Sequence, residues 1–159
     1  MTTPVAEAPA ARLGPSLDSE ITWLLHRAAQ RMHAATGEQA EAHGLHLRDH
    51  IVLSALHLRP GLTQVELAKE VGLDKTTLMT QLDRLERSGL VVRRPDPRDR
   101  RARLPQITEA GEALREKVAH ACAEVEARTL KTFSPGQVAT FRRMLVHVIG
   151  DGTDRGSCL

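Results

Sequence analysis

The stretch 63–87 constrains the fold more than any other part of the chain, because it encodes two short helices separated by a tight turn. Thr63 and Glu66 form a T-x-x-E pattern, in which each side chain can cap a backbone amide of the other residue. Gly72 is free to take the left-handed conformation that ends a helix. Asp74 can cap the second helix, where its carboxylate also faces the positive end of the helix dipole. This arrangement is typical of a helix-turn-helix motif.

The second helix of this motif is amphipathic. Leu78, Leu82 and Leu85 recur at helical spacing and predict a buried stripe. The second helix of a helix-turn-helix enters the major groove of DNA, where Gln can pair with adenine, Arg with guanine, and the Thr methyl can touch thymine. A solvated helix face is the alternative for each single residue. The candidates for base and phosphate contact are the polar residues off the stripe, namely Lys75, Thr76, Thr77, Thr80, Gln81 and Arg84.

An arginine-rich hairpin is expected directly after this helix. Residues 90–93 indicate a strand, and residues 94–101 a turn, because they are rich in Pro and Asp. Residues 102–107 would form the return strand, with Pro105 either confining it to a sheet edge or shortening it. From Arg84 to Arg103 the sequence holds eight arginines and three acids, a net charge of +5, whereas the whole chain carries +2. Positive charge concentrated beside a polar helix face predicts nucleic-acid binding.

The hairpin resembles the wing of the MarR family of bacterial transcription regulators. The family's pattern D-P-x-D-R-R, followed by L-T-x-x-G, is matched by residues 96–101 (DPRDRR) and 107–111 (ITEAG), and the resemblance covers residues 17–150. It implies a mainly α winged helix-turn-helix fold with a small β wing and about six helices. It also implies a dimer formed through the N- and C-terminal helices.

The resemblance further implies how the wing acts. In MarR-like proteins the residues matching Asp99 and Arg101 lie near the tip, where the Arg enters the minor groove and the Asp holds it. A narrow minor groove concentrates negative potential, which favours a guanidinium. An ion pair inside the wing, between Arg101 and Asp99, is the alternative. The wing candidates for DNA contact are Arg94, Arg98, Asp99, Arg100, Arg101 and Arg103.

The rest of the chain predicts one domain, residues 16–150, between a disordered Ala/Pro-rich arm (1–15) and a flexible Gly-rich tail (151–159). Within this domain, residues 47–107 would form the DNA-binding unit, and residues 16–40 and 108–150 the dimerisation helices. We expect Ser16 or Asp18 to cap the first helix, Gly37 to mark its end, and Ser134 with Pro135 to start the last. The helix over 108–132 would bury a stripe of Ala110, Leu114, Val118, Ala121 and Val125.

The terminal helices have wide apolar stripes, although the DNA-binding unit already has a core of its own. A second copy of the chain is the simplest partner for these stripes. A two-fold dimer would place two recognition helices about 34 Å apart, the spacing needed to read palindromic double-stranded DNA in successive major grooves. The alternative is a monomer whose core these helices close.

A small-molecule inducer is also expected. The resemblance implies that phenolic or other aromatic anions bind between the dimer helices and the DNA-binding unit. A planar apolar surface beside positive or hydrogen-bonding groups suits such a ligand, and the candidates are Trp23, His26, Arg27 and His50. A ligand that prefers a dimer with wrongly spaced recognition helices would weaken DNA binding by the same factor. The alternative is that Trp23 is ordinary interface packing.

Other chemistry is not expected. His43, His46, His50 and His57 have plausible metal-ligand spacing, but no cysteine or carboxylate pair completes a tetrahedral site, so we expect no metal and no cofactor. Proton sensitivity near neutral pH is another interpretation of these histidines. Cys122 lies mid-helix and Cys158 in the tail, whereas MarR-like peroxide sensors carry their cysteine at the start of the first helix. A thiol sensor is therefore disfavoured.

The sequence lacks the G-x-S-x-G, P-loop, G-x-G-x-x-G and H-E-x-x-H patterns, so we expect no enzyme. A winged helix used only for protein interaction is the alternative, but it would not need the wing arginines. The sequence has no apolar run near the ~18 residues of a membrane-spanning helix and no secretion signal pattern. We therefore expect a cytoplasmic protein without a membrane partner.

Overall fold

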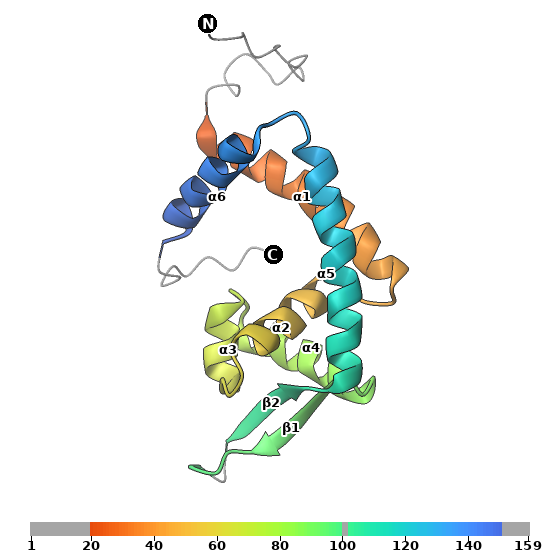
Figure 1. Cartoon of the computed structure of the whole chain (residues 1–159). Coiled ribbons are helices and arrows are strands. Elements are labelled where there is room, and N and C mark those ends of the chain that lie inside the picture. The colour runs from red at the N-terminus through yellow and green to blue at the C-terminus, as the bar shows by residue number, and fades with distance from the viewer. Residues whose placement is uncertain (1–19, 100–101, 151–159) are drawn as a thin grey trace, which may run out of the picture. The chain divides into compact units, whose positions relative to one another are not determined.

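A computed structural model describes residues 20–99 and 102–150, which form six helices and one two-stranded sheet. The elements are α1 (Ile21–Ala42), α2 (Leu47–Leu58), α3 (Gln64–Glu70), α4 (Lys75–Arg87), β1 (Val91–Pro95), β2 (Arg103–Ile107), α5 (Glu109–Thr129) and α6 (Pro135–Ile149) (Figure 1). The predicted mainly α fold with a small β wing is confirmed. The expected arm and tail lie outside the described residues. The chain divides into two compact units, residues 1–34 and 35–159, and each is described by itself.

The helix-turn-helix is formed by α3 and α4, and the predicted caps are present at both helix starts. The Thr63 amide donates to the Glu66 carboxylate at 2.8 Å, and the Glu66 amide donates to Thr63 Oγ1 at 3.3 Å. Asp74 Oδ1 accepts the Thr77 amide at 2.9 Å. Gly72 has a φ of 66°, the left-handed conformation that lets the chain turn between the two helices.

The first helix was predicted over residues 16–40 with Gly37 marking its end, and α1 continues through Gly37 to Ala42. Gly37 does not end the helix, because a single glycine inside a helix costs only about 1 kcal/mol. The helix ends where Gly44 takes a φ of 77° and the Leu45 amide donates to the Ala40 carbonyl at 3.0 Å. Ala40 and Leu45 are both buried at this turn. The expected caps, Ser16 and Asp18, lie outside the described residues.

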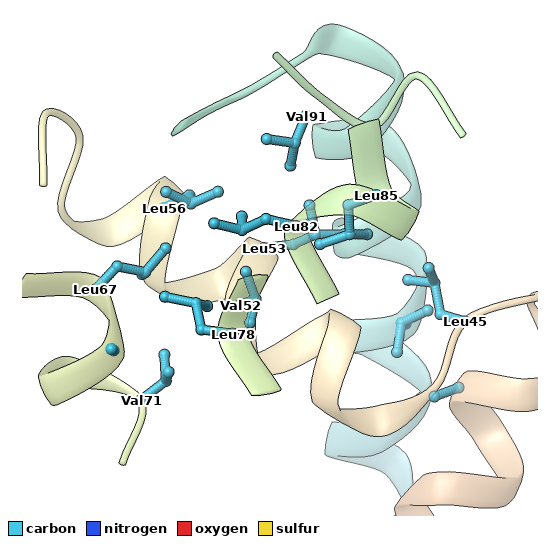
Figure 2. Close-up of a cluster of buried hydrophobic side chains, with 13 residues drawn as sticks. Leu45, Val52, Leu53, Leu56, Leu67, Val71, Leu78, Leu82, Leu85 and Val91 are labelled. Atoms are coloured by element: carbon cyan, nitrogen blue, oxygen red, sulfur yellow. The ribbon is translucent and has the colours of Figure 1, made fainter. Parts of the chain in front are cut away.

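The core of the second unit gathers leucines and valines from the helix-turn-helix, α2, β1 and α5 (Figure 2). The predicted stripe of α4 is confirmed, with its three leucines at most 1% exposed. These leucines point at residues of α2, among them Val52 and Leu53 (Figure 2). The fully buried side chains from these elements are Val52, Leu53, Leu67, Leu78, Leu82, Leu85 and Val118. This core fixes which face of α4 is left outside.

The wing is an antiparallel hairpin in which Val91 pairs with Ile107 and Arg93 pairs with Pro105. Pro105 lies in a sheet of two strands, so it occupies an edge as predicted. Its side chain is fully buried, and Val91 is buried as well, so the base of the wing packs against the rest of the unit. Residues 100 and 101 at the tip lie outside the described residues.

The N-terminus of α5 packs closely on the junction between α4 and β1. Thr108 donates from its hydroxyl to the Gly89 carbonyl at 2.7 Å and from its amide to the Leu90 carbonyl at 3.0 Å. Gly111 is buried beneath Leu90, and a Cβ added to it would lie 2.2 Å from the Leu90 carbonyl oxygen. The expected stripe is corrected here: Ala110 is exposed and Gly111 faces inward, because this close approach leaves room only for a glycine.

Gly111→Ala is therefore expected to destabilise the protein by ~2 kcal/mol, since a methyl group would meet backbone that cannot move aside. Gly37→Ala is the matched control, because Gly37 is also helical and a Cβ there meets nothing within 4 Å. The control should be neutral or more stable by ~0.5–1 kcal/mol. Urea unfolding measures both. Equal effects of the two substitutions would show that Gly111 is not tightly packed.

Candidate nucleic-acid interface

The outer face of α4 begins with exposed polar side chains. Lys75 and Thr76 occupy the first turn, and Thr80 follows one turn later; all three are exposed. Thr77 is half-buried, and its hydroxyl donates to Asp74 Oδ2 at 2.5 Å, so this side chain completes the helix cap. Within the predicted set, Lys75, Thr76 and Thr80 are therefore the residues most available to a duplex.

Two other predicted recognition residues are engaged inside the chain. Arg84 Nη2 donates to Asp49 Oδ1 and to Gln81 Oε1, each at 2.5 Å. Gln81 is only 8% exposed, which corrects the expectation that it lies on an open polar face. The physical reason is that α2 covers this part of α4 and supplies the acid that Arg84 binds.

Asp49 was missed by sequence reasoning. It lies in the first turn of α2, where its other oxygen, Oδ2, accepts the His46 amide at 3.2 Å, and its side chain is 3% exposed. One carboxylate thus caps α2 and binds the recognition helix. An acid three residues after His46, the residue before the expected helix, was the available signal for the cap. Its second partner is 35 residues away in the sequence and could not be read from spacing.

In the wing, Arg94 and Arg103 are exposed and lie in paired strands. Among the described residues, no hydrogen bond or ion pair joins either of them to another side chain. Arg94 is opposite Leu104, and Arg103 is opposite Pro95. These two guanidinium groups are available for phosphate contact beside α4.

Arg98 instead shapes the turn at the wing tip. Its Nε and Nη2 lie 3.2 Å from the Asp96 carboxylate oxygens, and its amide donates to Asp96 Oδ1 at 2.8 Å. The side-chain hydrogen bond from Arg98 is the main cause that lowers the pKa of the Asp96 carboxyl. Asp99 is exposed, and its carbonyl accepts the Ala102 amide at 2.9 Å. The predicted Arg100 and Arg101 lie outside the described residues.

The predicted ligand residues fall into two groups. On α1, the Trp23 and His26 rings stack with centroids 5.9 Å apart, and the Arg27 guanidinium lies 6.0 Å from the Trp23 ring centroid. Trp23 Nε1 is buried and has no hydrogen-bond partner among the described residues. His50 lies on α2 in the second unit. The structure therefore brings three of the four residues together.

The described histidines and Cys122 form neither a metal site nor a reactive thiol centre. Within residues 20–99 and 102–150, no three His, Cys, Asp or Glu side chains gather in a way that could hold a metal ion. Cys122 is half-buried, and burial raises the pKa of its thiol, which disfavours the reactive thiolate. Cys158 lies outside the described residues. In the same two ranges, no helix is both long enough and apolar enough to cross a membrane.

The last helix leaves its apolar side chains uncovered. No residue of α6 is buried. A hollow of about 640 Å³ lies where the chain turns from α5 into α6, and Leu130, Phe133, Phe141 and Met144 are among its lining residues. Phe141 is 43% exposed and Met144 is 61% exposed. Large exposed apolar surfaces of this kind mark interaction sites.

Comparisons with known proteins agree with this geometry. Residues 43–102, which span α2 to the wing, match the MarR family model. The chain is therefore similar to the MarR family over its DNA-binding region. It is 27% identical over 155 residues to the HTH-type transcriptional repressor NicR of Pseudomonas putida, and the match covers 98% of each chain.

Solved structures of MarR-family regulators share the fold. CouR from Rhodococcus jostii RHA1, bound to p-coumaroyl-CoA, matches with a TM-score of 0.77 and 29% identity, over 87% of this chain and 97% of that one. The repressor CouR bound to a 23-mer DNA duplex matches with a TM-score of 0.78 and 25% identity, over 90% of this chain and 99% of that one. Both structures thus resemble this chain over the helix-turn-helix and the wing.

The burial of His50 predicts that the stability of the second unit depends on pH. Burial, and secondarily the nearby Arg115 charge, lower the pKa of His50 from its ordinary value of about 6.5. A lowered pKa in the folded state means that protonation favours the unfolded chain. The stability that neutral His50 contributes is complete above about pH 6.5 and is lost as the pH falls through the lower folded-state value.

Wild-type protein should thus lose free energy of unfolding more steeply between pH 7 and pH 5 than the His50→Gln variant does. Urea unfolding across this range measures the difference. The exposed His120→Gln serves as the matched control, because it removes a histidine from the surface of α5. Parallel curves for wild type and His50→Gln would contradict the prediction.

Proposed function

We propose that this MarR-family regulator is a homodimeric repressor that binds a palindromic DNA operator and leaves it when a small aromatic anion binds. The observation that supports it best is the adjacency of two exposed basic or polar surfaces. These are the N-terminal half of α4 (Lys75, Thr76 and Thr80) and the strands of the wing (Arg94 and Arg103). A helix for the major groove and an arginine hairpin for the neighbouring backbone form a duplex-binding pair.

The recognition residues have distinct proposed roles. Lys75 lies at the first position of α4, where it suits a phosphate contact, and the Thr76 and Thr80 side chains can reach base edges. Arg84 and Gln81 lie behind these residues, where they are held by their mutual hydrogen bond. By resemblance, Arg101 is proposed to enter the minor groove, and Arg100 stays a candidate for DNA contact because of its charge. Relatives support the DNA partner, because NicR is named a repressor and CouR binds a DNA duplex.

Dimerisation is proposed through α1, α5 and α6. The exposed apolar residues of α6 continue beyond the hollow to Val146, Val148 and Ile149, each about two-thirds exposed. A helix with an apolar stripe and no buried residue needs a partner to be stable in water. A second copy of the chain supplies one, and its two-fold axis provides the symmetry of a palindrome.

The inducer is proposed to be an aromatic carboxylate or a similar anion. The Trp23 ring offers a flat apolar surface, and Arg27 and His26 place cationic or hydrogen-bonding groups beside it. The CouR ligand p-coumaroyl-CoA combines an aromatic acyl group with negative phosphates, so a relative accommodates this type of chemistry. Release follows if the ligand binds better to a dimer whose recognition helices are wrongly spaced.

DNA binding can be tested with the two exposed wing arginines. Arg94→Ala and Arg103→Ala should each weaken binding to the chain's own upstream intergenic DNA, and each should reduce the slope of log K against log salt by ~0.9 for a lost phosphate contact. Fluorescence anisotropy over a salt series measures both quantities. Arg128→Ala, on an exposed position near the end of α5, is the control and should leave the slope unchanged. No binding by wild type at low salt would instead favour a protein-interaction module.

The dimer can be tested with one apolar residue of α6. Phe141→Asp places a charge in the hollow that we assign to the partner chain, so the protein should sediment as a monomer and bind the operator more weakly. Val65→Asp is the matched control, because Val65 is also an exposed apolar residue but lies on α3. A wild-type monomer, or a dimer that survives Phe141→Asp, would contradict this part of the proposal.

A further inference from the structure

We propose that Arg93 is a positioning residue, which together with Asp83 and Glu86 holds the wing on the recognition helix at the angle that lets both contact one duplex. This inference rests on the proposed DNA-binding function. It assigns to Arg93 a different role from that of its neighbour Arg94, although the sequence shows the two as equivalent charges.

The geometry of Arg93 differs from that of a DNA-facing arginine. Its side chain is 15% exposed, although it lies in a two-stranded hairpin. Its Nη2 donates to Asp83 Oδ1, and its Nη1 lies 3.7 Å from Glu86 Oε2. Its backbone amide also donates to Glu86 Oε1 at 3.2 Å. Asp83 and Glu86 are three residues apart on α4, so their side chains lie on the same face of the helix.

The other contacts of the wing do not fix its angle in the same way. Val91 and Pro105 are buried at its base, and Pro105 is the residue paired with Arg93 across the hairpin. Apolar packing is non-directional, and a two-stranded hairpin has little stability of its own. A guanidinium held by two carboxylates has a defined direction and is stronger than a neutral hydrogen bond. Burial of Val91 and Pro105 thus holds the base of the wing in place, and the ion pairs of Arg93 set its direction.

The electrostatic arrangement favours positioning over charge attraction. Two carboxylates beside a DNA-binding face repel phosphates, so they weaken binding unless they serve another purpose. Arg93 Nε is also buried without a hydrogen-bond partner among the described residues, which costs further free energy. Arg94 shows the contrasting case, because it is exposed and forms no ion pair with an acid among the described residues. These costs are explained if the contact sets the geometry of the wing.

The double variant Asp83→Asn/Glu86→Gln distinguishes positioning of Arg93 from simple charge repulsion, because the two predict opposite changes in DNA affinity. If the acids act only through their charge, their removal strengthens DNA binding. Loss of positioning instead weakens binding to the specific operator about tenfold, and it lowers the salt slope by ~0.9 for each wing phosphate contact that is lost. In a hydroxyl-radical footprint, protection of the outer minor grooves should be lost, while protection across the central major grooves remains.

The controls make each outcome decisive. Asp83 and Glu86 are 55% and 41% exposed, so amides of the same shape leave the core intact, and this is checked by the unfolding midpoint and the dimer mass. Glu70→Gln/Glu109→Gln removes two exposed acids away from the wing contact and should not weaken binding. Arg93→Lys keeps the positive charge but loses the planar fork, so it should weaken binding and reduce the outer footprint as well.

Tighter or unchanged operator binding by Asp83→Asn/Glu86→Gln, or by Arg93→Lys, would overturn the assignment of Arg93. If wild-type protein binds no DNA, the proposed function fails, and this result is distinct from a failure of the positioning role. A wild-type protein that binds its operator, together with weakened variants whose outer minor-groove protection is lost, supports both.

Discussion

Burial of the leucine face of α4 is the constraint on which the rest of the structure depends. Leu78, Leu82 and Leu85 enter a core shared with α2, and each buried leucine contributes ~1.5–3 kcal/mol relative to exposure. Because the stripe recurs at helical spacing, its burial also determines which residues of α4 remain outside. The availability of Lys75, Thr76 and Thr80 is therefore a consequence of core packing.

The positive charge of the segment is divided among different tasks. The sequence shows eight arginines between Arg84 and Arg103, and their number alone predicts a nucleic-acid surface. Arg84 and Arg93 bind acids of α2 and α4, and Arg98 binds the carboxylate that shapes the wing tip. Arg94 and Arg103 are left exposed. Ion pairs thus link α4 to α2 and to β1, and only some of the arginines remain exposed for contact with a partner.

Local features of the fold could be predicted from the sequence, while contacts between distant segments could not. The capping pair Thr63–Glu66, the turn at Gly72 and the start of α6 at Ser134 each depend on neighbouring residues, and each was predicted. The sequence pointed to Gly37 as the end marker of α1, whereas the turn is at Gly44, where Leu45 is buried in the core. Gln81 was expected to be open, because no spacing rule shows that Asp49 lies against the same side of α4. The fold was thus more predictable than the exposure of individual site residues.

The glycine beneath Leu90 has a mechanical consequence. Gly111 brings the first turn of α5 against the peptide that connects the end of α4 to β1, and Thr108 bonds to both carbonyls of that connection. A tilt of α5 about its first turn would therefore displace Gly89 and Leu90 with it. Since α4 ends and β1 begins at that peptide, a displacement of the first turn of α5 would move the recognition helix and the wing together.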